Sequence, residues 1–367
     1  MLDGPDRLKP VDELTIGDIE TIRLILRGES VVDWRRLHLT DEREAREFLE
    51  SQEFRPDEPS DRARLEKVKN EAISYLRRHF DFPIPKPVER ASVEELLVLG
   101  SGRGHRQVCA CTILKAMHIV HHADGRELLF TLPMSMQEVF NLVEEKVYRV
   151  IGDMLAAGFP ITEFVGGRKN KDSLYTKLLS KPETIAANVY DRLRFRIVTR
   201  SADDILPTIL YLSKRVFPFT HVIPGQSLNT LFRLRSYLSR FEHLAAHADG
   251  TQVHLNDDLT LGDNIFSGSS FRAIHFVADV PVRLPREALE GAPSSAWALG
   301  PVVSVLSEFQ ILDRETEAAN ELGDGSHASY KARQKGAVMR RLKLGVIDRP
   351  SAAPEATPTP SDADSGR

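Results

Sequence analysis

The stretch VVSVLSEFQILDRETEAANELGDGSHASYKARQK, residues 302–335, decides the fold of this chain. Its first part alternates with the period of a β-strand, so that Val305 and Phe309 fall on one face and Glu308 on the other. A carboxylate in the middle of so apolar a strand is costly to bury unless it is paired or binds a metal. A helix is expected next, over residues 315–322. The direction in which Glu308 points therefore bears on most of the chemistry.

Length and composition are those of an ordinary globular protein. With 367 residues the chain has room for two or three domains, and its net charge of -4 gives no sign of a nucleic-acid coat protein or a polybasic membrane binder. The apolar runs fall well short of the roughly 18 residues of a membrane span, and the N-terminus lacks the apolar core of a signal peptide. Cys109 and Cys111 are poorly placed for a disulfide and too few for a zinc cage. A reducing, cytoplasmic setting is therefore expected.

Residues 1–158 are expected to form an all-α N-terminal region. Helical periodicity covers six segments, 16–28, 41–54, 61–80, 93–100, 108–122 and 132–158. The glycine-rich segment GSGRGHRQ, 100–107, could cradle a phosphate. It follows no clear strand and lacks the ending of a P-loop, so a flexible helix-entry loop is the favoured interpretation.

A group of histidines in the fifth helical segment allows two interpretations. His118, His121 and His122 with Asp124 could ligate a metal, because residues four apart share a helix face. The string does not have the spacing of a catalytic metal site, however. The favoured interpretation is that these histidines stand at the C-terminal end of a helix, where they interact well with the negative pole of its dipole.

Residues 159–345 have the pattern of an α+β domain with a mixed β-sheet flanked by helices. Residues 162–179 read as a basic loop that enters a helix, and strands are expected at 189–199, 271–284 and 302–312. A polar insertion without clear pattern occupies about 231–265. The tail, 346–367, is rich in proline, alanine, serine and aspartate and is expected to be disordered.

Basic and acidic residues of this domain suggest a phosphate site. Arg168, Lys171 and Lys177 surround a helix entry, where cations and backbone N–H groups favour a polyphosphate. Asp191 and Glu308 lie in two strands, and Mg²⁺ is usually held by one or two carboxylates together with substrate phosphates. The spacing alone leaves a second interpretation open, in which these are solvated strand faces and simple salt bridges.

The segment from about 159 to 335 resembles the synthetase domain of RelA/SpoT-type alarmone synthetases, which is nucleotidyltransferase-like. The resemblance is carried by four motifs, GRKNKDSLYTKLL, VYDRLRFRIV, SSFRAIHFVADV and SEFQIL, in the family's order. Behind them, five further positions keep the family's intervals without a gap, namely Glu321, Gly323, His327, Tyr330 and Lys331.

The resemblance implies a Mg²⁺-dependent pyrophosphokinase that transfers the β,γ-pyrophosphoryl group of ATP to the 3′-hydroxyl of a guanine nucleotide. It implies that Asp191 and Glu308 are the catalytic and metal-binding acids. The residues implied for ATP and its phosphates are Arg168, Lys171, Lys177 and Arg196. The residues implied for the acceptor are Phe271, His275, Gln310, His327 and Lys331.

Two departures from the family's pattern keep other functions open. Leu312 and Asp313 stand where the family has arginine and threonine, and residues 226–229 lack its lysine–aspartate pair. The acceptor could thus be another nucleotide or the 3′ end of a tRNA. A non-catalytic nucleotide-binding regulator on the same fold and a purely structural protein are the other hypotheses. Homo-oligomers are conceivable, and no alarmone hydrolysis is expected.

Overall fold

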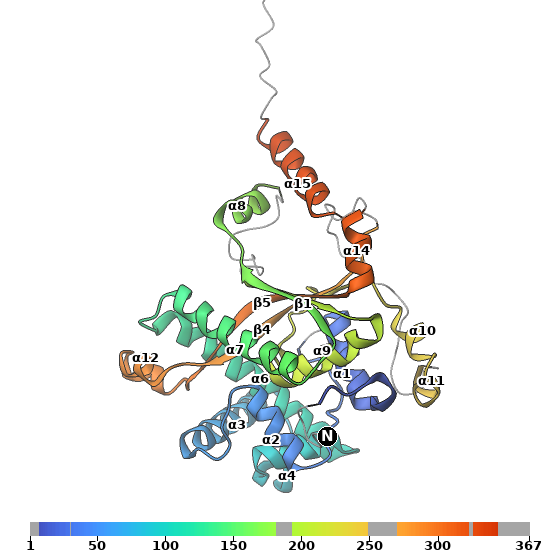
Figure 1. Cartoon of the computed structure of the whole chain (residues 1–367). Coiled ribbons are helices and arrows are strands. Elements are labelled where there is room, and N and C mark those ends of the chain that lie inside the picture. The colour runs from blue at the N-terminus through green and yellow to red at the C-terminus, as the bar shows by residue number, and fades with distance from the viewer. Residues whose placement is uncertain (1–6, 30, 181–192, 249–269, 323–325, 344–367) are drawn as a thin grey trace, which may run out of the picture.

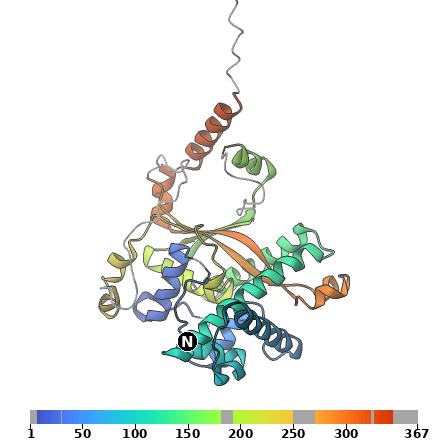
Figure 2. The same cartoon turned by 180° about the vertical axis from the view of Figure 1, so that it is seen from behind.

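The computed structural model describes residues 7–29, 31–180, 193–248, 270–322 and 326–343. Figures 1 and 2 show a twisted sheet across the molecule, with most of the helices gathered on one side of it. Residues Asp191 and 346–367, for which the sequence predicts a metal ligand and a disordered tail, lie outside this description. No helix in the described ranges is both long and apolar enough to cross a membrane.

Within the described residues the sheet has five strands, and it is mixed, as the sequence predicts. The strands are β1 (Ile161–Arg168), β2 (Leu193–Thr199), β3 (Leu228–Asn229), β4 (Ile274–Arg283) and β5 (Val302–Asp313). Their order is β1-β2-β5-β4-β3, so β5 lies in the middle. Strands β2 and β5 pair in parallel, whereas β1 with β2, β3 with β4, and β4 with β5 pair antiparallel. The expected α+β architecture with an all-α segment before it is therefore confirmed.

One face of the sheet forms the larger of two apolar cores. Phe309 lies at its centre, with ring centroids 5.4 Å from Phe195, 5.4 Å from Phe276 and 5.0 Å from Phe217. All four rings are fully buried, and each contributes about 2 kcal/mol or more of burial free energy. This face is covered by α1 (Ile16–Arg27), α7 (Met136–Ala156) and α9 (Ile205–Arg215), together with the end of α6, from which Leu128 is buried in the same core.

The second apolar core is built by helices of the N-terminal region, with Leu96 and Ile113 fully buried in it. Its helices are α2 (Glu42–Ser51), α3 (Pro59–Phe80), α4 (Lys86–Arg90), α5 (Val93–Ser101) and α6 (His105–Thr131). Between α5 and α6 the chain turns through Gly104, whose φ of 82° favours glycine. The glycine-rich segment is thus a helix-entry loop, as favoured above. Because α1 and α7 pack in the larger core, the two cores do not divide the chain at residue 158.

Three helices stand on the opposite side of the sheet from α1, α7 and α9 (Figure 1). They are α8 (Lys171–Ser180), α14 (Arg314–Leu322) and α15 (His327–Arg341). Helices α8 and α15 contact each other, and Gln334 Nε2 donates to Ser180 Oγ over 3.3 Å. These helices carry four of the predicted site residues, Lys171 and Lys177 on α8 and His327 and Lys331 on α15.

The histidines of α6 lie at the junction of the two cores. His122 Nδ1 is 3.4 Å from Asp279 Oδ2, and the His118 ring contacts the His221 ring at 5.2 Å. Asp124 does not join them, because it is ion-paired with Arg64. Within the described residues no group of three or more ligands could hold a metal. The interpretation that these histidines stand at the end of a helix is wrong, because α6 continues to Thr131 and the histidines lie inside it.

Two segments differ from the sequence-based prediction. Residues 161–168 are a strand, β1, rather than a loop, and they pair with β2. The insertion begins with two short helices, α10 (Leu234–Leu238) and α11 (Glu242–Ala248), while residues 249–269 lie outside the description. Leu234, Tyr237 and Leu244 are buried in the larger core, so this part of the insertion packs against the domain. The remaining helices are α12 (Arg286–Glu290), α13 (Ser294–Trp297), η1 (Val11–Glu13), η3 (Ala202–Asp204) and η4 (Phe219–His221).

Candidate active site

The polar face of the sheet brings several predicted site residues together. In the parallel register of β2 and β5, Arg194 is opposite Glu308 and Arg196 is opposite Gln310. In the antiparallel register of β4 and β5, His275 is opposite Gln310. Residues at paired positions point to the same face of a sheet. The face that is turned away from the phenylalanine core therefore carries a carboxylate, an amide, a histidine and two arginines.

Glu308 is buried and ionised. His275 Nε2 lies 2.9 Å and Arg194 Nε 3.3 Å from the same carboxylate oxygen, Oε1. Burial alone would raise the pKa of this carboxyl group, but His275, Arg194 and Lys177 together outweigh it. They hold the pKa of Glu308 far below its ordinary value of 4.5. The buried glutamate that the sequence indicated is thus a paired carboxylate.

Arg194 is a site residue that sequence reasoning did not single out. Its Nη2 donates to Gln310 Oε1 over 2.6 Å while its Nε faces Glu308, so two residues of β5 fix the guanidinium. The side chain is 45% exposed, and a guanidinium has five N–H donors in a rigid fork. N–H groups of the Arg194 guanidinium are therefore available to bind an anion. The alternation of residues 193–199 predicts that Arg194 and Arg196 share one face of a strand. It does not predict that this strand pairs with β5, which brings Arg194 next to Glu308.

The predicted donor-side cations lie in different settings. Lys171 begins α8 and is exposed, and Lys177, also on α8, is close enough for its charge to lower the pKa of Glu308. Arg168 ends β1, and its guanidinium is bound to α7 through Glu144, with Nη2 2.6 Å from Oε2 and Nε 3.0 Å from Oε1. In this conformation Arg168 is a structural ion pair rather than an open phosphate ligand.

Helix α14 occupies part of the same face. Arg196 Nη2 is 2.7 Å from Glu317 Oε1, which ties β2 to α14. Asp313 caps α14, because its Oδ1 accepts from the backbone N–H of Glu315 and of Thr316, each over 3.0 Å. Leu312 is fully buried. Leu312 therefore serves packing and Asp313 serves capping.

Within the described part of the chain, Phe271 and Lys331 form no hydrogen bond or ion pair with this cluster. Phe271 precedes β4 and is partly buried, and Lys331 is an exposed residue of α15. His327 begins α15, but its side chain lies outside the described part of the chain, as does Asp191. Their assigned roles stay predictions.

The residues present fit Mg²⁺ only if another carboxylate and substrate phosphates complete its coordination. Glu308 supplies an ionised oxygen ligand, and no cluster of three potential ligands lies within the described residues. Asp191 comes two residues before Leu193, whose register partner on β5 is Ser307, the neighbour of Glu308. Magnesium sites commonly use one or two carboxylates and the phosphates of a nucleotide, which agrees with this sparse set.

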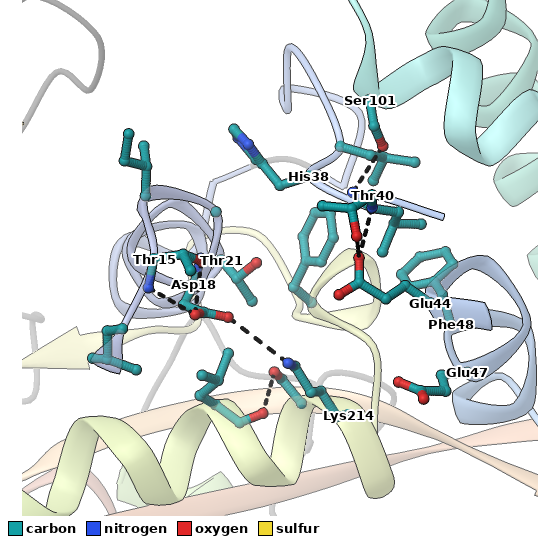
Figure 3. A pocket seen from close by; sticks show the side chains of 18 of the residues that line it. Thr15, Asp18, Thr21, His38, Thr40, Glu44, Glu47, Phe48, Ser101 and Lys214 are labelled. Atoms are coloured by element: carbon teal, nitrogen blue, oxygen red, sulfur yellow. Dashed lines mark hydrogen bonds and ion pairs between the residues drawn. The ribbon is translucent and has the colours of Figure 1, made fainter. Parts of the chain in front are cut away.

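A separate cavity of about 990 Å³ lies at the boundary of the two apolar cores. Figure 3 shows residues of α1, α2 and α9 around it, among them Asp18, Glu44 and Lys214. No strand residue lines it, so it is distinct from the polar face of the sheet. No local sequence pattern indicates this cavity, because its walls come from several segments that are far apart in the chain.

Solved structures that resemble this chain are small alarmone synthetases and a GTP pyrophosphokinase family protein. Small alarmone synthetase 1 from Bacillus subtilis, bound to its product pppGpp, is 18% identical, and the likeness covers 56% of this chain and 93% of that one at a TM-score of 0.29. The GTP pyrophosphokinase family protein from Streptococcus pneumoniae is 16% identical over 57% of this chain and 90% of that one, also at 0.29. Small alarmone synthetase 2 from Bacillus subtilis is 15% identical over 60% and 92%, at 0.27.

No protein-family model and no curated protein sequence matches the chain. The structures named above are therefore what the chain is similar to, and their TM-scores are too low to carry an argument about its activity.

Proposed function

We propose that this protein transfers the β,γ-pyrophosphoryl group of ATP to the 3′-hydroxyl of a guanine nucleotide. The observation that carries the proposal is Glu308, a buried carboxylate whose pKa is held low by His275 and Arg194 on a face that also carries Arg196. Such a group is suited to binding a metal or a hydroxyl next to a polyphosphate, because it keeps its charge where positive partners gather. The order of the family-like motifs supports ATP and a guanine nucleotide as the substrates.

In this reaction the 3′-oxygen of the acceptor forms a bond to the β-phosphorus of ATP. The bond between that phosphorus and the oxygen it shares with the α-phosphate breaks, so that AMP leaves and the hydroxyl proton is released to solvent. A Mg²⁺ ion held by Asp191 and Glu308 would supply charge neutralisation on the phosphates. Because its pKa is lowered, Glu308 is a weak base, and we assign it to binding and orientation rather than to proton removal.

Arg194 is assigned to the pyrophosphoryl group itself. In the strand order β1-β2-β5-β4-β3, it lies between the donor-side elements β1 and α8 and the acceptor-side strand β4. Gly167, opposite Arg194 on β1, would have no atom of the described chain within 4 Å of an added Cβ, so the face is open there. A fixed guanidinium beside this open part of the sheet face is well placed to stabilise the charge of a transferred group.

The test is an assay of the full chain with Mg²⁺ and ATP labelled at the γ-phosphate. The acceptors are GTP, GDP, GMP and deacylated tRNA, each in a separate reaction. We expect AMP and an equimolar labelled product carrying a 3′-pyrophosphate with a guanine nucleotide. Label on tRNA alone would move the acceptor to the alternative considered above, and no AMP with any acceptor would overturn the proposed reaction.

A non-catalytic nucleotide-binding regulator is the second candidate. It is favoured by Leu312 and Asp313, which are used for packing and for capping α14 and leave the site without the family's arginine there. Calorimetric titration with a non-hydrolysable ATP analogue separates the candidates. Binding of the analogue without AMP formation from ATP would favour the regulator.

A further inference from the structure

The cavity between α1, α2 and α9 has a use that the proposed reaction does not require. It measures about 990 Å³, at the upper end of the range for small-molecule sites, and lies at a boundary between two cores, where such sites are frequent. Its lining includes charged residues of both signs and several apolar side chains. The arrangement of these groups indicates the kind of molecule that would bind.

One wall of the cavity is acidic and is formed by α2. Glu44 uses its Oε2 to accept from the backbone N–H and the hydroxyl of Thr40, over 2.6 and 2.8 Å. Glu47 uses its Oε1 to pair with Arg43 Nη1 over 2.9 Å, and Arg43 does not line the cavity. Each carboxylate has a second oxygen, and carboxylates with spare acceptor positions bind ammonium groups strongly.

A cation stands on the floor of the cavity, on α9. The ion pair of Lys214 Nζ with Asp18 Oδ1 is long, 3.8 Å, and the Lys214 side chain is 59% exposed. The other oxygen of Asp18 already accepts from Lys9 and from the backbone and hydroxyl of Thr15. Lys214 is therefore weakly held and can pair with an anionic group that enters the cavity (Figure 3).

An apolar surface is also part of the lining. Phe48 of α2 and Phe219 contact each other with ring centroids 6.2 Å apart, and both line the cavity together with Leu37 and Leu210. Phe48 and Phe219 are only partly buried, so part of each ring is available to a ligand. Covering such surface contributes about 25 cal/mol per Å².

We propose that this cavity binds a zwitterionic molecule of the amino-acid class, namely a short peptide with free termini. Its ammonium group pairs with Glu44 and Glu47, its carboxylate pairs with Lys214, and an apolar side chain covers Phe48 and Phe219. A cavity of this volume is too large for a single amino acid to fill. Because α2 belongs to the smaller core and α9 to the larger, a bound peptide holds the two cores together and raises the melting temperature.

The experiment is calorimetric titration of the full chain, without ATP or acceptor, with the dipeptide Leu-Phe. Two ligand forms are compared, one with free termini and one N-acetylated and C-amidated. We expect the free form to bind with a Kd of about 1 mM or tighter and to raise the melting temperature, and the blocked form to bind at least about tenfold more weakly. Equal binding of both forms, or no binding of either, would overturn the proposal. So would tighter binding of AMP or of spermidine, which carry charge of one sign.

Variants on the two charged sides complete the test. Glu47→Gln is preferred to a change of Glu44, because Glu44 also holds Thr40, and Lys214→Ala removes the opposite charge. Each should weaken binding of the free dipeptide about tenfold, the loss of roughly one charge-assisted contact. The matched control is Glu42→Gln, an exposed glutamate of the same helix that does not line the cavity and should leave the Kd unchanged. Equal losses in all three variants would contradict the assignment. The result is independent of whether the chain makes AMP.

Discussion

Glu308 and Asp279 are two buried carboxylates on neighbouring strands, β5 and β4, yet their surroundings shift them in opposite directions. Asp279 is fully buried, and burial raises the pKa of its carboxyl group above the ordinary 3.8 in spite of Arg126 and His122. The pKa of Glu308 is lowered, although burial acts on it in the same sense. Burial alone therefore does not decide which of the two is ionised.

The difference lies in the number of partners around each carboxylate and in their distances. Glu308 Oε1 has His275 at 2.9 Å and Arg194 at 3.3 Å, and the charge of Lys177 adds to theirs. Asp279 Oδ2 has Arg126 at 3.2 Å and His122 at 3.4 Å, while its Oδ1 is buried with no partner among the described residues. A buried acceptor without a partner favours the neutral carboxyl group. The first site is therefore suited to chemistry and the second to packing.

The largest effect is expected from neutralising each carboxylate in turn. Glu308→Gln removes the charge on the polar face, and the rate of AMP formation should fall by about a thousandfold or more, as for loss of a principal electrostatic group. Asp279→Asn is the matched control, and its rate should stay within about fivefold of the parent. Steady-state assays with ATP and the best acceptor measure both. Equal losses in the two variants would show that Glu308 has no special role.

Removing the partner of Glu308 comes next. In Arg194→Ala the kcat should fall about a hundredfold, as expected for the loss of one hydrogen-bond donor to a developing charge. Arg194→Lys keeps the positive charge but loses the guanidinium that contacts Gln310, so its kcat should lie between those of the parent and of Arg194→Ala. Without Arg194 the pKa of Glu308 rises. Activity that needs the ionised form should then be lost at a higher pH than in the parent.

The measurement for Arg194 is kcat as a function of pH, with KM for ATP determined separately. Arg286→Ala is the control, because Arg286 forms an exposed ion pair with Glu290 on α12. If Arg194→Ala lowered only the melting temperature and left kcat and its pH profile unchanged, the residue would be structural and the assignment to the pyrophosphoryl group would fail.

The histidines at the junction around Asp279 should make the stability of the protein depend on pH. Burial and the neighbouring His122 lower the pKa of His118 from 6.5 to about 4. The unfolded chain therefore binds protons that the folded chain does not, and stability is lost as the pH falls below about 6.5. From pH 7 to pH 5, His118 alone should reduce the free energy of unfolding by roughly 2 kcal/mol.

Urea denaturation at several pH values tests this dependence. His121, whose pKa burial and Arg64 lower to about 3, and His221 shift in the same direction and add to the slope. In His118→Gln the loss of stability on acidification should be smaller than in the parent, whereas exposed His79→Gln should leave it as it is. A slope unaffected by His118→Gln would contradict the account.

The smallest effect is expected for the stability of Asp279→Asn at neutral pH. Asparagine resembles the neutral carboxyl group that burial favours, and Arg126 is partly exposed and can be hydrated. The free energy of unfolding should change by about 1 kcal/mol or less. A loss of several kcal/mol would mean that the ionised Asp279–Arg126 pair stabilises the junction.

Much of the fold could be predicted from local pattern. The alternation around Glu308 predicts β5, and the helical periods predict α1 to α3 and α7 with nearly the observed ends. Strand β1 was missed, because Gly166 and Gly167 are poor strand formers and interrupt its apolar pattern. The structure explains Gly166, since an added Cβ would lie 2.9 Å from the Tyr148 hydroxyl.

The candidate site was predictable only in part. Glu308 and His275 were identified from sequence and are in contact, but the role of Arg194 depends on the register of two strands more than a hundred residues apart in the chain. The same holds for the ion pair of Arg168 with Glu144 on α7, which no local pattern indicates. The cavity depends on side chains from α1, α2 and α9, whose packing is a tertiary property.

The most direct test of the central claim is a pH titration of the two carboxyl groups by infrared difference spectroscopy. Spectra of the parent are compared with those of Glu308→Gln and of Asp279→Asn. We predict that Glu308→Gln removes the band of an ionised carboxylate that is still present below pH 4.5, the ordinary pKa of glutamate. Asp279→Asn should remove the band of a protonated carboxyl group that is still present above pH 3.8, the ordinary pKa of aspartate. A protonated Glu308 at pH 4.5 would contradict the account, because the proposed chemistry depends on its charge.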